Sequence, residues 1–166
     1  TDQGKFKSSK KFVIEEFLSG EEASYFILSD GKSYKFFGTA QDHKRIGEGD
    51  TGPNTGGMGA YSPSNIITNK VEEKIKKEII EPTLKGLKKL GCPFVGILYA
   101  GLIIKNDQPK LIEYNIRLGD PECQVLMMRL KTDLLKIILA CKKKQINKIT
   151  INWSNKKAIT IVASSK

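Results

Sequence analysis

The feature that most restricts the fold is an Asp30-Gly31 pair between two runs rich in aromatic and aliphatic residues. We read residues 23–29 and 33–37 as strands, and an Asp-Gly pair between strands strongly indicates a two-residue hairpin turn. A hairpin pairs its strands antiparallel. Similar runs predict strands at residues 11–18, 94–105, 110–116 and 158–163, and 94–105 is apolar enough to be an interior strand. We therefore expect a largely antiparallel sheet.

Helices are expected between these strands. Asn69 followed by Glu72 is typical of a capping box, and apolar residues then recur at helical spacing until Gly91, which can end the helix. Pro82 should kink or divide this helix, because proline lacks the N–H group that the helix needs. Two shorter helices fit residues 121–130 and 132–143. Together these elements predict an α+β class with a mixed, largely antiparallel sheet.

The stretch from Gly38 to Pro63 fits neither the strand nor the helix period and is rich in glycine. A long irregular segment inside a compact domain is uncommon and is usually functional or disordered. Glycine leaves backbone N–H groups open to a bound anion. The spacing matches neither a Walker A loop nor a dinucleotide-binding fingerprint. We therefore expect a binding loop of another type, in which His43, the single histidine, has a local hydrogen-bonding role.

The composition gives little support to nucleic-acid or membrane binding. The net charge is +10, but lysine is spread along the chain and only Arg45, Arg117 and Arg129 are arginine, the residue that base and phosphate recognition favours. No apolar run approaches the roughly 18 residues of a membrane span, and residues 1–11 lack the apolar part of a secretory signal. The three cysteines match no metal-binding or disulfide spacing. We expect a cytoplasmic protein with no nucleic-acid or membrane partner.

The most informative strand is the one predicted over residues 110–116. Side chains alternate along a strand, so Glu113 and Asn115 share one face. The other face is apolar and should enter the core; it carries Ile112, Tyr114 and Ile116. Carboxylate and amide oxygens suit magnesium, although a single carboxylate needs phosphate oxygens to complete the ligand shell. The alternative, which spacing alone favours, is a strand with one solvated polar face.

Charged residues gather after this strand. Asp120 before Pro121 is a typical helix start, with aspartate as N-cap and proline at the first helical position. Capping does not account for Arg117 and Glu122 at the same corner, where a helix N-terminus beside an arginine can hold a phosphate or a carboxylate. The acidic segment 14–22 is most simply a solvated face. It becomes functional only if the chain there passes an adenosine, whose amino and hydroxyl groups are hydrogen-bond donors.

Five segments together resemble one enzyme family. They are Val-Ile-Glu-Glu-Phe-Leu at 13–18, Gln-Asp-His-Lys-Arg at 41–45, Asp-Thr-Gly-Pro-Asn-Thr-Gly-Gly-Met-Gly-Ala-Tyr-Ser-Pro at 50–63, Leu-Tyr-Ala-Gly-Leu at 98–102 and Arg-Leu-Gly-Asp-Pro-Glu at 117–122. In residues and order they are similar to the glycinamide ribonucleotide synthetases, also called phosphoribosylamine–glycine ligases. The resemblance covers residues 12–163, and the glycine-rich segment and residues 117–122 are its most specific parts.

The resemblance implies an ATP-grasp fold, in which ATP lies between two α+β lobes, and this chain resembles the C-terminal lobe. Residues 1–150 would form the lobe that binds nucleotide and metal, and residues 151–166 would begin the C-terminal domain. The N-terminal domain and the glycine-rich ATP lid of the family have no counterpart in this chain. We therefore expect a fragment of a longer enzyme, whose remaining domains are its partners.

The resemblance also implies roles for individual residues. The ATP-binding residues would be Glu15, Glu16 and Leu18 at the adenine and Glu22 at the ribose. Glu113 and Asn115 would bind magnesium or manganese, because residues 99–102 offer no counterpart of the third acidic ligand of many superfamily members. Arg117 and Asp120 would be catalytic. The residues on the substrate side would be Asp50, Pro53, Asn54, Thr55, Gly56, Gly57, Gly119 and Glu122.

The implied reaction joins glycine to 5-phosphoribosylamine through an acyl phosphate, with ATP cleaved to ADP and phosphate. The protein would position the reactants and neutralise the transferring phosphoryl group. With one lobe, the chain alone is expected to be inactive. One alternative is another ATP-grasp carboxylate–amine ligase, against which the glycine-rich loop and residues 117–122 argue. The other is a lysine-rich nucleic-acid-binding module, whose affinity would be sensitive to salt.

Overall fold

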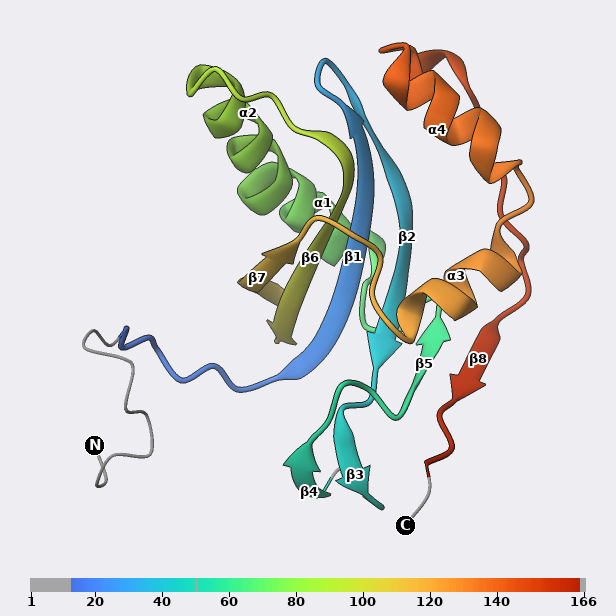
Figure 1. Cartoon of the computed structure of the whole chain (residues 1–166). Helices are drawn as coiled ribbons and strands as arrows, with labels where there is room; N and C mark the ends of the chain where they lie inside the picture. The colour runs from blue at the N-terminus through green and yellow to red at the C-terminus, as the bar shows by residue number, and fades with distance from the viewer. Residues whose placement is uncertain (1–12, 50, 165–166) are drawn as a thin grey trace, which may run out of the picture.

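The computed structural model describes residues 13–49 and 51–164. An antiparallel six-stranded sheet in the order β7-β6-β1-β2-β5-β8 forms its centre, and a separate ribbon pairs β3 with β4 (Figure 1). The sheet strands are β1 (Glu21–Asp30), β2 (Tyr34–Asp42), β5 (Gly59–Ser62), β6 (Val95–Lys105), β7 (Gln108–Asn115) and β8 (Ala158–Ile161). The ribbon strands are β3 (Arg45–Gly47) and β4 (Thr51–Asn54). The predicted α+β class with a largely antiparallel sheet is confirmed.

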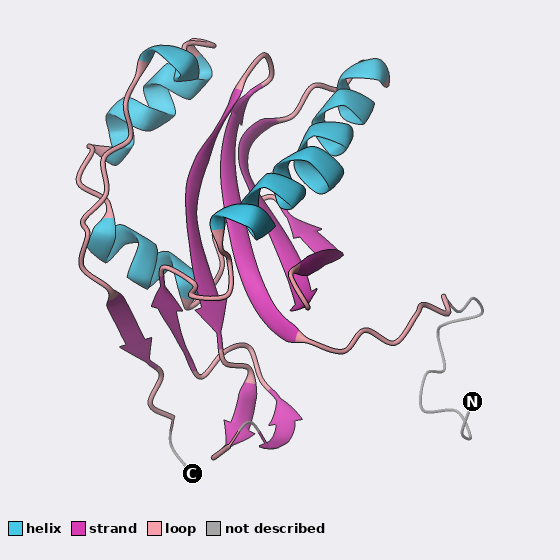
Figure 2. Cartoon of the chain, turned by 180° about the vertical axis from the view of Figure 1, so that it is seen from behind, coloured by secondary structure: helices cyan, strands magenta, loops and turns pink. Residues whose placement is uncertain are grey.

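Helices cover both faces of the sheet, as Figure 2 shows from behind. One face carries α1 (Asn69–Lys74), the π-helical η1 (Ile75–Ile80) and α2 (Glu81–Lys89); the other carries α3 (Glu122–Arg129), α4 (Leu134–Lys142) and the 3₁₀ helix η2 (Ile146–Lys148). Strand β1 is buried on both sides. Tyr25 and Ile27 pack in a core with α1 and η1, and Phe26 and Leu28 pack in a second core with α3 and α4. Burying each such side chain contributes about 1.5–3 kcal/mol, so these two cores hold the three layers together.

The predicted β1–β2 hairpin is confirmed, although its loop has three residues, Gly31–Ser33, in place of two. Gly31 has a φ of 83°, which glycine adopts without strain. The buried Asp30 carboxylate accepts hydrogen bonds from the backbone N–H groups of Lys32 (2.9 Å), Ser33 (2.7 Å) and Ile146 (3.1 Å). Burial acts to raise the pKa of Asp30, but these donors and the Lys32 charge lower it overall. Asp30 therefore ties the hairpin to η2.

The long helix differs from its prediction at the start. Thr68 is the N-cap, and its hydroxyl accepts from the Val71 N–H at 3.3 Å. The expected Asn69–Glu72 capping box is wrong, because the Glu72 carboxylate pairs with Lys76 one turn later. The division expected at Pro82 occurs immediately before it, where η1 absorbs the break in the hydrogen-bond ladder as a π-helical segment.

Strand β7 lies at the sheet edge, and its predicted faces are partly wrong. The pairing register with β6 shifts within β7, which makes Ile112 the extra residue of a β-bulge. Ile112 and Glu113 consequently line the same pocket, and Ile112 does not enter the core. Ile116 is also outside the core, with 77% of its surface exposed. Tyr114 is on the helix-covered side as predicted and donates to the Ile79 carbonyl at 3.2 Å.

Two other expectations are corrected. Residues 13–18 form no strand and pair with no strand of the sheet; residues 11 and 12 lie outside the described part. The stretch 38–63 is not irregular throughout, since it completes β2 and then forms β3, β4 and β5, whose glycines hide the strand period. The strands predicted at 94–105 and 158–163 and both shorter helices are confirmed. No helix within 13–49 and 51–164 is long and apolar enough to cross a membrane.

Candidate active site

Polar side chains gather at the end of the sheet where β1 begins and β2 ends, beside the β3–β4 ribbon (Figure 1). Three adjoining pockets lie there, which we name the N-terminal, middle and acidic pockets, with volumes of about 550, 610 and 230 Å³. The N-terminal and middle pockets share Phe17, Leu18 and Ile103. The middle and acidic pockets share Glu22, Asp42, Lys44 and Asn54. The three pockets therefore adjoin one another through shared lining residues.

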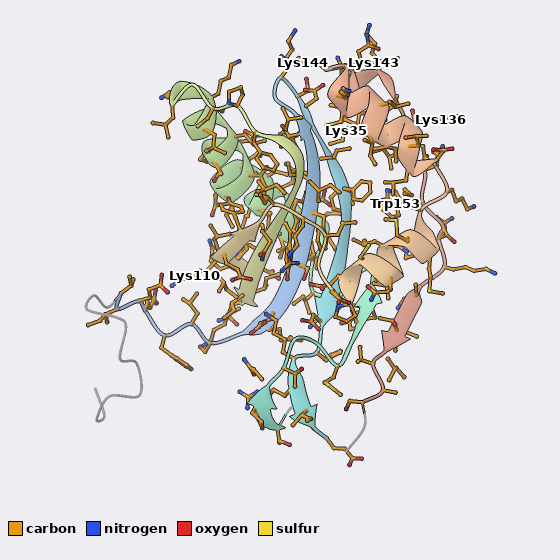
Figure 3. All side chains as sticks on the ribbon, viewed as in Figure 1. Lys35, Lys110, Lys136, Lys143, Lys144 and Trp153 are labelled. Carbon is orange, nitrogen blue, oxygen red and sulfur yellow. The ribbon has the colours of Figure 1, made fainter. Side chains whose placement is uncertain are left out.

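The N-terminal pocket lies between residues 15–18 and strand β7. The predicted ATP-binding residues Glu15, Glu16 and Leu18 line one wall, opposite apolar residues of β6 and β7. Lys110, seen beside this segment in Figure 3, donates to both Glu16 carboxylate oxygens at 2.8 and 2.7 Å and ties the segment to β7. Extended backbone opposite apolar side chains can bind a flat ring, with contacts on its face and hydrogen bonds at its edge.

Glu113 and Asn115 share a face as predicted, and the Asn115 amide donates to Glu113 Oε1 at 2.9 Å. Glu113 lines the acidic pocket together with Glu22 and Asp42. Within the described residues, no group of three His, Cys, Asp or Glu side chains could hold a metal by itself. Magnesium commonly takes one or two protein carboxylates and completes its shell with phosphates and water. The residues present therefore fit a magnesium ion that is shared with a phosphate-bearing ligand.

Glu122, a predicted substrate residue, is buried in the interior of the fold and is 2% exposed. Ser24 donates to Glu122 Oε1 at 2.9 Å, and the same hydroxyl oxygen lies 2.9 Å from the Tyr99 hydroxyl. Burial and the Glu122 charge raise the pKa of Tyr99, which keeps its hydroxyl protonated. A Cβ added to Gly119 would overlap a Glu122 carboxylate oxygen. The buried carboxylate thus requires glycine at position 119.

Asp42, at the end of β2, lines both the acidic and the middle pocket. Its Oδ1 atom is buried and has no hydrogen-bond partner among the described residues. Burial and the Glu122 carboxylate raise the pKa of Asp42 to about 7, against the opposing effect of Lys44. Asp42 therefore changes charge near neutral pH, and its carboxylate has capacity for a further hydrogen bond.

Lys44 follows β2 and pairs with Glu22, Nζ to Oε2 at 3.0 Å. Burial acts to lower the pKa of Lys44, but the hydrogen bond to Glu22 and the charges of Glu22, Asp42 and Glu113 raise it overall. The Lys44 carbonyl accepts from both the N–H and the hydroxyl of Thr55, each at 2.7 Å. The backbone of this lysine is therefore fixed, and its charged end is held by a carboxylate.

The glycine-rich loop packs against the same end of the sheet. Gly57 has a φ of 124°, and a Cβ added there would lie 2.5 Å from Pro121 Cδ and 2.9 Å from Asp42 Oδ1. Only glycine fits this contact. The loop thereby joins β2 to the segment that precedes α3.

The other predicted loop residues differ in their placement. Asn54 lines the middle and acidic pockets, and Thr55 holds the Lys44 carbonyl. Pro53 is exposed on β4, and the α-carbon of Gly56 faces open space. Asp50 lies outside the described residues.

Arg117 and Asp120, the predicted catalytic residues, are exposed on the segment between β7 and α3. Arg117 donates to the Leu118 carbonyl at 2.9 Å, and Asp120 accepts from the Gln124 side chain at 2.8 Å. The expectation that Asp120 is an N-cap is wrong, because α3 begins at Glu122, Pro121 occupies the N-cap position and no side chain caps it. The Asp120 carboxylate is instead held by a side chain of the helix, and the residue is exposed.

Four residues of this region had no role assigned from the sequence: Ser24, Asp42, Lys44 and Tyr99. Asp42 and Lys44 belong to the segment 41–45, which carried the family resemblance but no individual function. Strand β2 was expected to end at Phe37 and runs to Asp42. The strand pattern continues past Gly38. Following it through this glycine would have placed Asp42 at the end of the strand and Lys44 just beyond it.

A family model described as phosphoribosylglycinamide synthetase, ATP-grasp (A) domain, matches residues 1–123. Relatives named phosphoribosylamine–glycine ligase from Mesorhizobium japonicum and Vigna unguiculata are 57% and 52% identical over 154 and 167 residues, which cover 93% and 99% of this chain.

The chain spans 36% of the length of the Mesorhizobium relative and 54% of that of the Vigna relative. The crystal structure of phosphoribosylamine–glycine ligase from Thermotoga maritima is similar, with a TM-score of 0.79 and 33% identity, and the match covers 89% of this chain and 37% of that one. The chain therefore belongs to the phosphoribosylglycinamide synthetase family, whose ATP-grasp A domain it matches.

Proposed function

We propose that the protein containing this chain joins glycine to 5-phosphoribosylamine, with ATP cleaved to ADP and phosphate. The observation that carries this proposal is the connection of the three pockets on a chain of this family. The N-terminal pocket fits a flat ring and adjoins the middle pocket, where Glu22 can accept hydrogen bonds from sugar hydroxyls. Glu22 also lines the acidic pocket together with Glu113, on the face that fits magnesium. This order matches the base, sugar and phosphates of a nucleotide.

In this proposal the chain is the C-terminal lobe of the ATP-grasp unit over residues 1–150, and residues 151–166 lead into the C-terminal domain. Adenine lies in the N-terminal pocket, and Glu22 accepts from the ribose hydroxyls. Glu113 and Asn115 hold magnesium or manganese, which when bound supplies positive charge to the phosphates. The parts of the relatives that this chain does not span would supply the second lobe and the lid.

The chemistry requires positioning and charge, and no covalent protein nucleophile. An oxygen of the glycine carboxylate bonds to the γ-phosphorus while the bond to ADP breaks, which gives an acyl phosphate. The amine of 5-phosphoribosylamine then bonds to the carbonyl carbon, phosphate leaves and the nitrogen loses a proton. Arg117 would hold the glycine carboxylate, and Asp120 would face the amine. The substrate wall would be formed by Asp50, Pro53, Asn54, Thr55, Gly56, Gly57, Gly119 and Glu122.

We propose a cytoplasmic setting for this enzyme. The name of one relative, from Arabidopsis thaliana, carries the word chloroplastic.

The metal face is tested by Glu113→Gln in a complete enzyme, made by placing this chain into the matching segment of the Mesorhizobium ligase. Losing a carboxylate that holds magnesium at the reacting phosphate should lower glycine-dependent ADP release about 10²-fold or more, with an unchanged circular dichroism spectrum. Lys70→Met, in an exposed ion pair with Asp107, is the control and should remain active. Near-normal turnover of Glu113→Gln would contradict the metal assignment. ADP release driven by a different acid and amine would favour another ATP-grasp ligase.

We also predict that the 166-residue chain alone lacks this activity. A single lobe leaves bound phosphates open to water, which weakens each electrostatic contact. The same coupled assay compares the chain with the chimera. Turnover by the chain within about tenfold of the chimera would show that one lobe suffices.

A further inference from the structure

The acidic pocket holds an imbalance of charge. Among the described residues that line it, Glu22, Asp42 and Glu113 are carboxylates, and Lys44 is the single basic side chain. No other lysine lines this pocket within the part of the chain that the structure describes, and Figure 3 shows Lys136, Lys143 and Lys144 on the α4 side of the molecule, away from this end of the sheet. Lys44 is therefore the basic residue placed to meet an anion in this pocket.

The position of Lys44 differs from that of an ordinary surface lysine. Its main-chain carbonyl accepts two hydrogen bonds from Thr55, which hold the backbone of Lys44 in position. Its side chain is 35% exposed and reaches Glu22, whose side chain is 45% exposed. An ion pair this open to solvent contributes about 0–1 kcal/mol and separates readily. The pair is thus poorly suited to stabilising the fold and well suited to exchanging partners.

A nucleotide offers the partners that such an exchange needs. Ribose hydroxyls are hydrogen-bond donors and satisfy Glu22, while phosphate oxygens are anionic acceptors and satisfy Lys44. Both residues line the middle and the acidic pocket, so a single ligand across the two pockets reaches both. Without the phosphate, Lys44 returns to Glu22.

Resting on the proposed function, we propose that Lys44 is a phosphate-binding residue of the nucleotide site, and that its ion pair with Glu22 is the resting state of a pair that a nucleotide separates. The ribose takes Glu22, and the phosphates take Lys44. A ligand that binds only Glu22 or only Lys44 must break the ion pair and leave the other residue without an oppositely charged group or hydrogen-bond partner. A ligand that binds both residues replaces both halves of the ion pair, so the pair favours such a ligand. Lys44 positions the triphosphate beside Glu113.

The test measures affinities by calorimetry in the chimeric enzyme, with Mg-ATP, adenosine and magnesium tripolyphosphate as probes. Lys44→Met removes a charge-assisted hydrogen bond to phosphate, so the Kd of Mg-ATP should rise about tenfold or more. The Kd of adenosine, which has no phosphate, should not rise and should fall slightly, because Glu22 no longer has to leave an ion pair. Lys44→Arg keeps the charge and should recover part of the Mg-ATP affinity. Lys70→Met breaks an exposed ion pair of 3.2 Å outside these pockets and is the matched control.

Glu22→Gln should change the affinities for adenosine and tripolyphosphate in opposite directions. Glutamine keeps one acceptor oxygen but lacks the charge and the second acceptor oxygen of glutamate, so Glu22→Gln should weaken adenosine binding. The same change frees Lys44 from its carboxylate and should tighten tripolyphosphate binding. Equal losses of Mg-ATP and adenosine affinity in Lys44→Met, or no loss of Mg-ATP affinity, would overturn the proposal. Weaker tripolyphosphate binding by Glu22→Gln would equally overturn the exchange of partners. If the unmodified chimera bound no Mg-ATP, the proposed function itself would fail, so the two failures are distinguishable.

Discussion

Each end of the β1–β2 hairpin carries an aspartate, Asp30 buried and Asp42 half-buried, and the two carboxylates have opposite surroundings. At the loop end, Asp30 accepts from three backbone N–H groups and its pKa is lowered. At the open end, Asp42 Oδ1 has no partner among the described residues, and its pKa is raised to about 7. Complete pairing stabilises a fold, whereas incomplete pairing beside a pocket leaves a bond for a ligand to make. The hairpin is thus a structural element at one end and part of the site at the other.

The two ends of the hairpin also differ in the space around a nearby glycine. Gly31 forms the hairpin loop, and a Cβ added there would lie 3.1 Å from a flexible Val95 methyl group. Gly57 lies against Asp42 and Pro121, and a Cβ added there would come within 3.0 Å of both. A Cβ at either glycine strains a positive φ, but at the loop end the neighbouring atoms need to move less than at the pocket end.

The largest predicted effect is the difference in stability between the Asp30→Ala and Asp42→Ala variants. Asp30→Ala leaves three backbone N–H groups in a buried region without their acceptor, so it should lower the free energy of unfolding by about 3 kcal/mol or more. Asp42→Ala removes a carboxylate that is already short of partners and should cost about 1 kcal/mol or less. Urea unfolding of the two variants measures both values. Equal costs would remove the distinction between a paired and an unpaired aspartate.

Substituting the glycines should give the next largest difference. Gly57→Ala introduces a Cβ that displaces Pro121 or Asp42 and also strains a positive φ, so we expect a loss of about 2–3 kcal/mol and a strong fall in turnover of the chimera. Gly31→Ala strains the hairpin loop alone and should cost about 1 kcal/mol with turnover unchanged. Thermal melting and ADP release are measured on both. A fully active Gly57→Ala enzyme would separate this loop from the site.

The smallest effect is on the pH dependence of stability. The pKa of Asp42 is raised from an unfolded value of 3.8 to about 7, so folding binds a proton between these values and stability falls as pH rises through that window. Asp30 acts in the other direction: its contribution is present above pH 3.8 and is lost as pH falls through its lowered folded pKa.

Asp42→Asn should therefore flatten the decline in stability between pH 3.8 and about pH 7, by on the order of 1 kcal/mol because solvent screens a partly exposed group. Asp30→Asn should leave that window unchanged and alter the profile below pH 4. Urea midpoints across this pH range check both variants. A slope that persists in Asp42→Asn would place the titrating group elsewhere.

Local patterns in the sequence determined much of the architecture. Asp30-Gly31 predicted the hairpin because a tight turn favours those residue types, and Gly91 ended the helix because a left-handed backbone favours glycine. Period-two alternation placed Glu113 and Asn115 on one face. These features depend on neighbours in the chain, so they can be predicted without knowing the fold. The family resemblance added which residues to examine.

Tertiary structure alone decided the parts that depend on distant neighbours. The bulge at Ile112 depends on the register with β6, and a one-residue shift moves a side chain to the other face of the sheet. The pairing of Glu22 with Lys44 and the burial of Glu122 against Ser24 arise because β1, β2 and α3 converge at one end of the sheet. The charge of Asp42 likewise depends on how much water and which carboxylates the fold places around it, and no spacing along the chain encodes that.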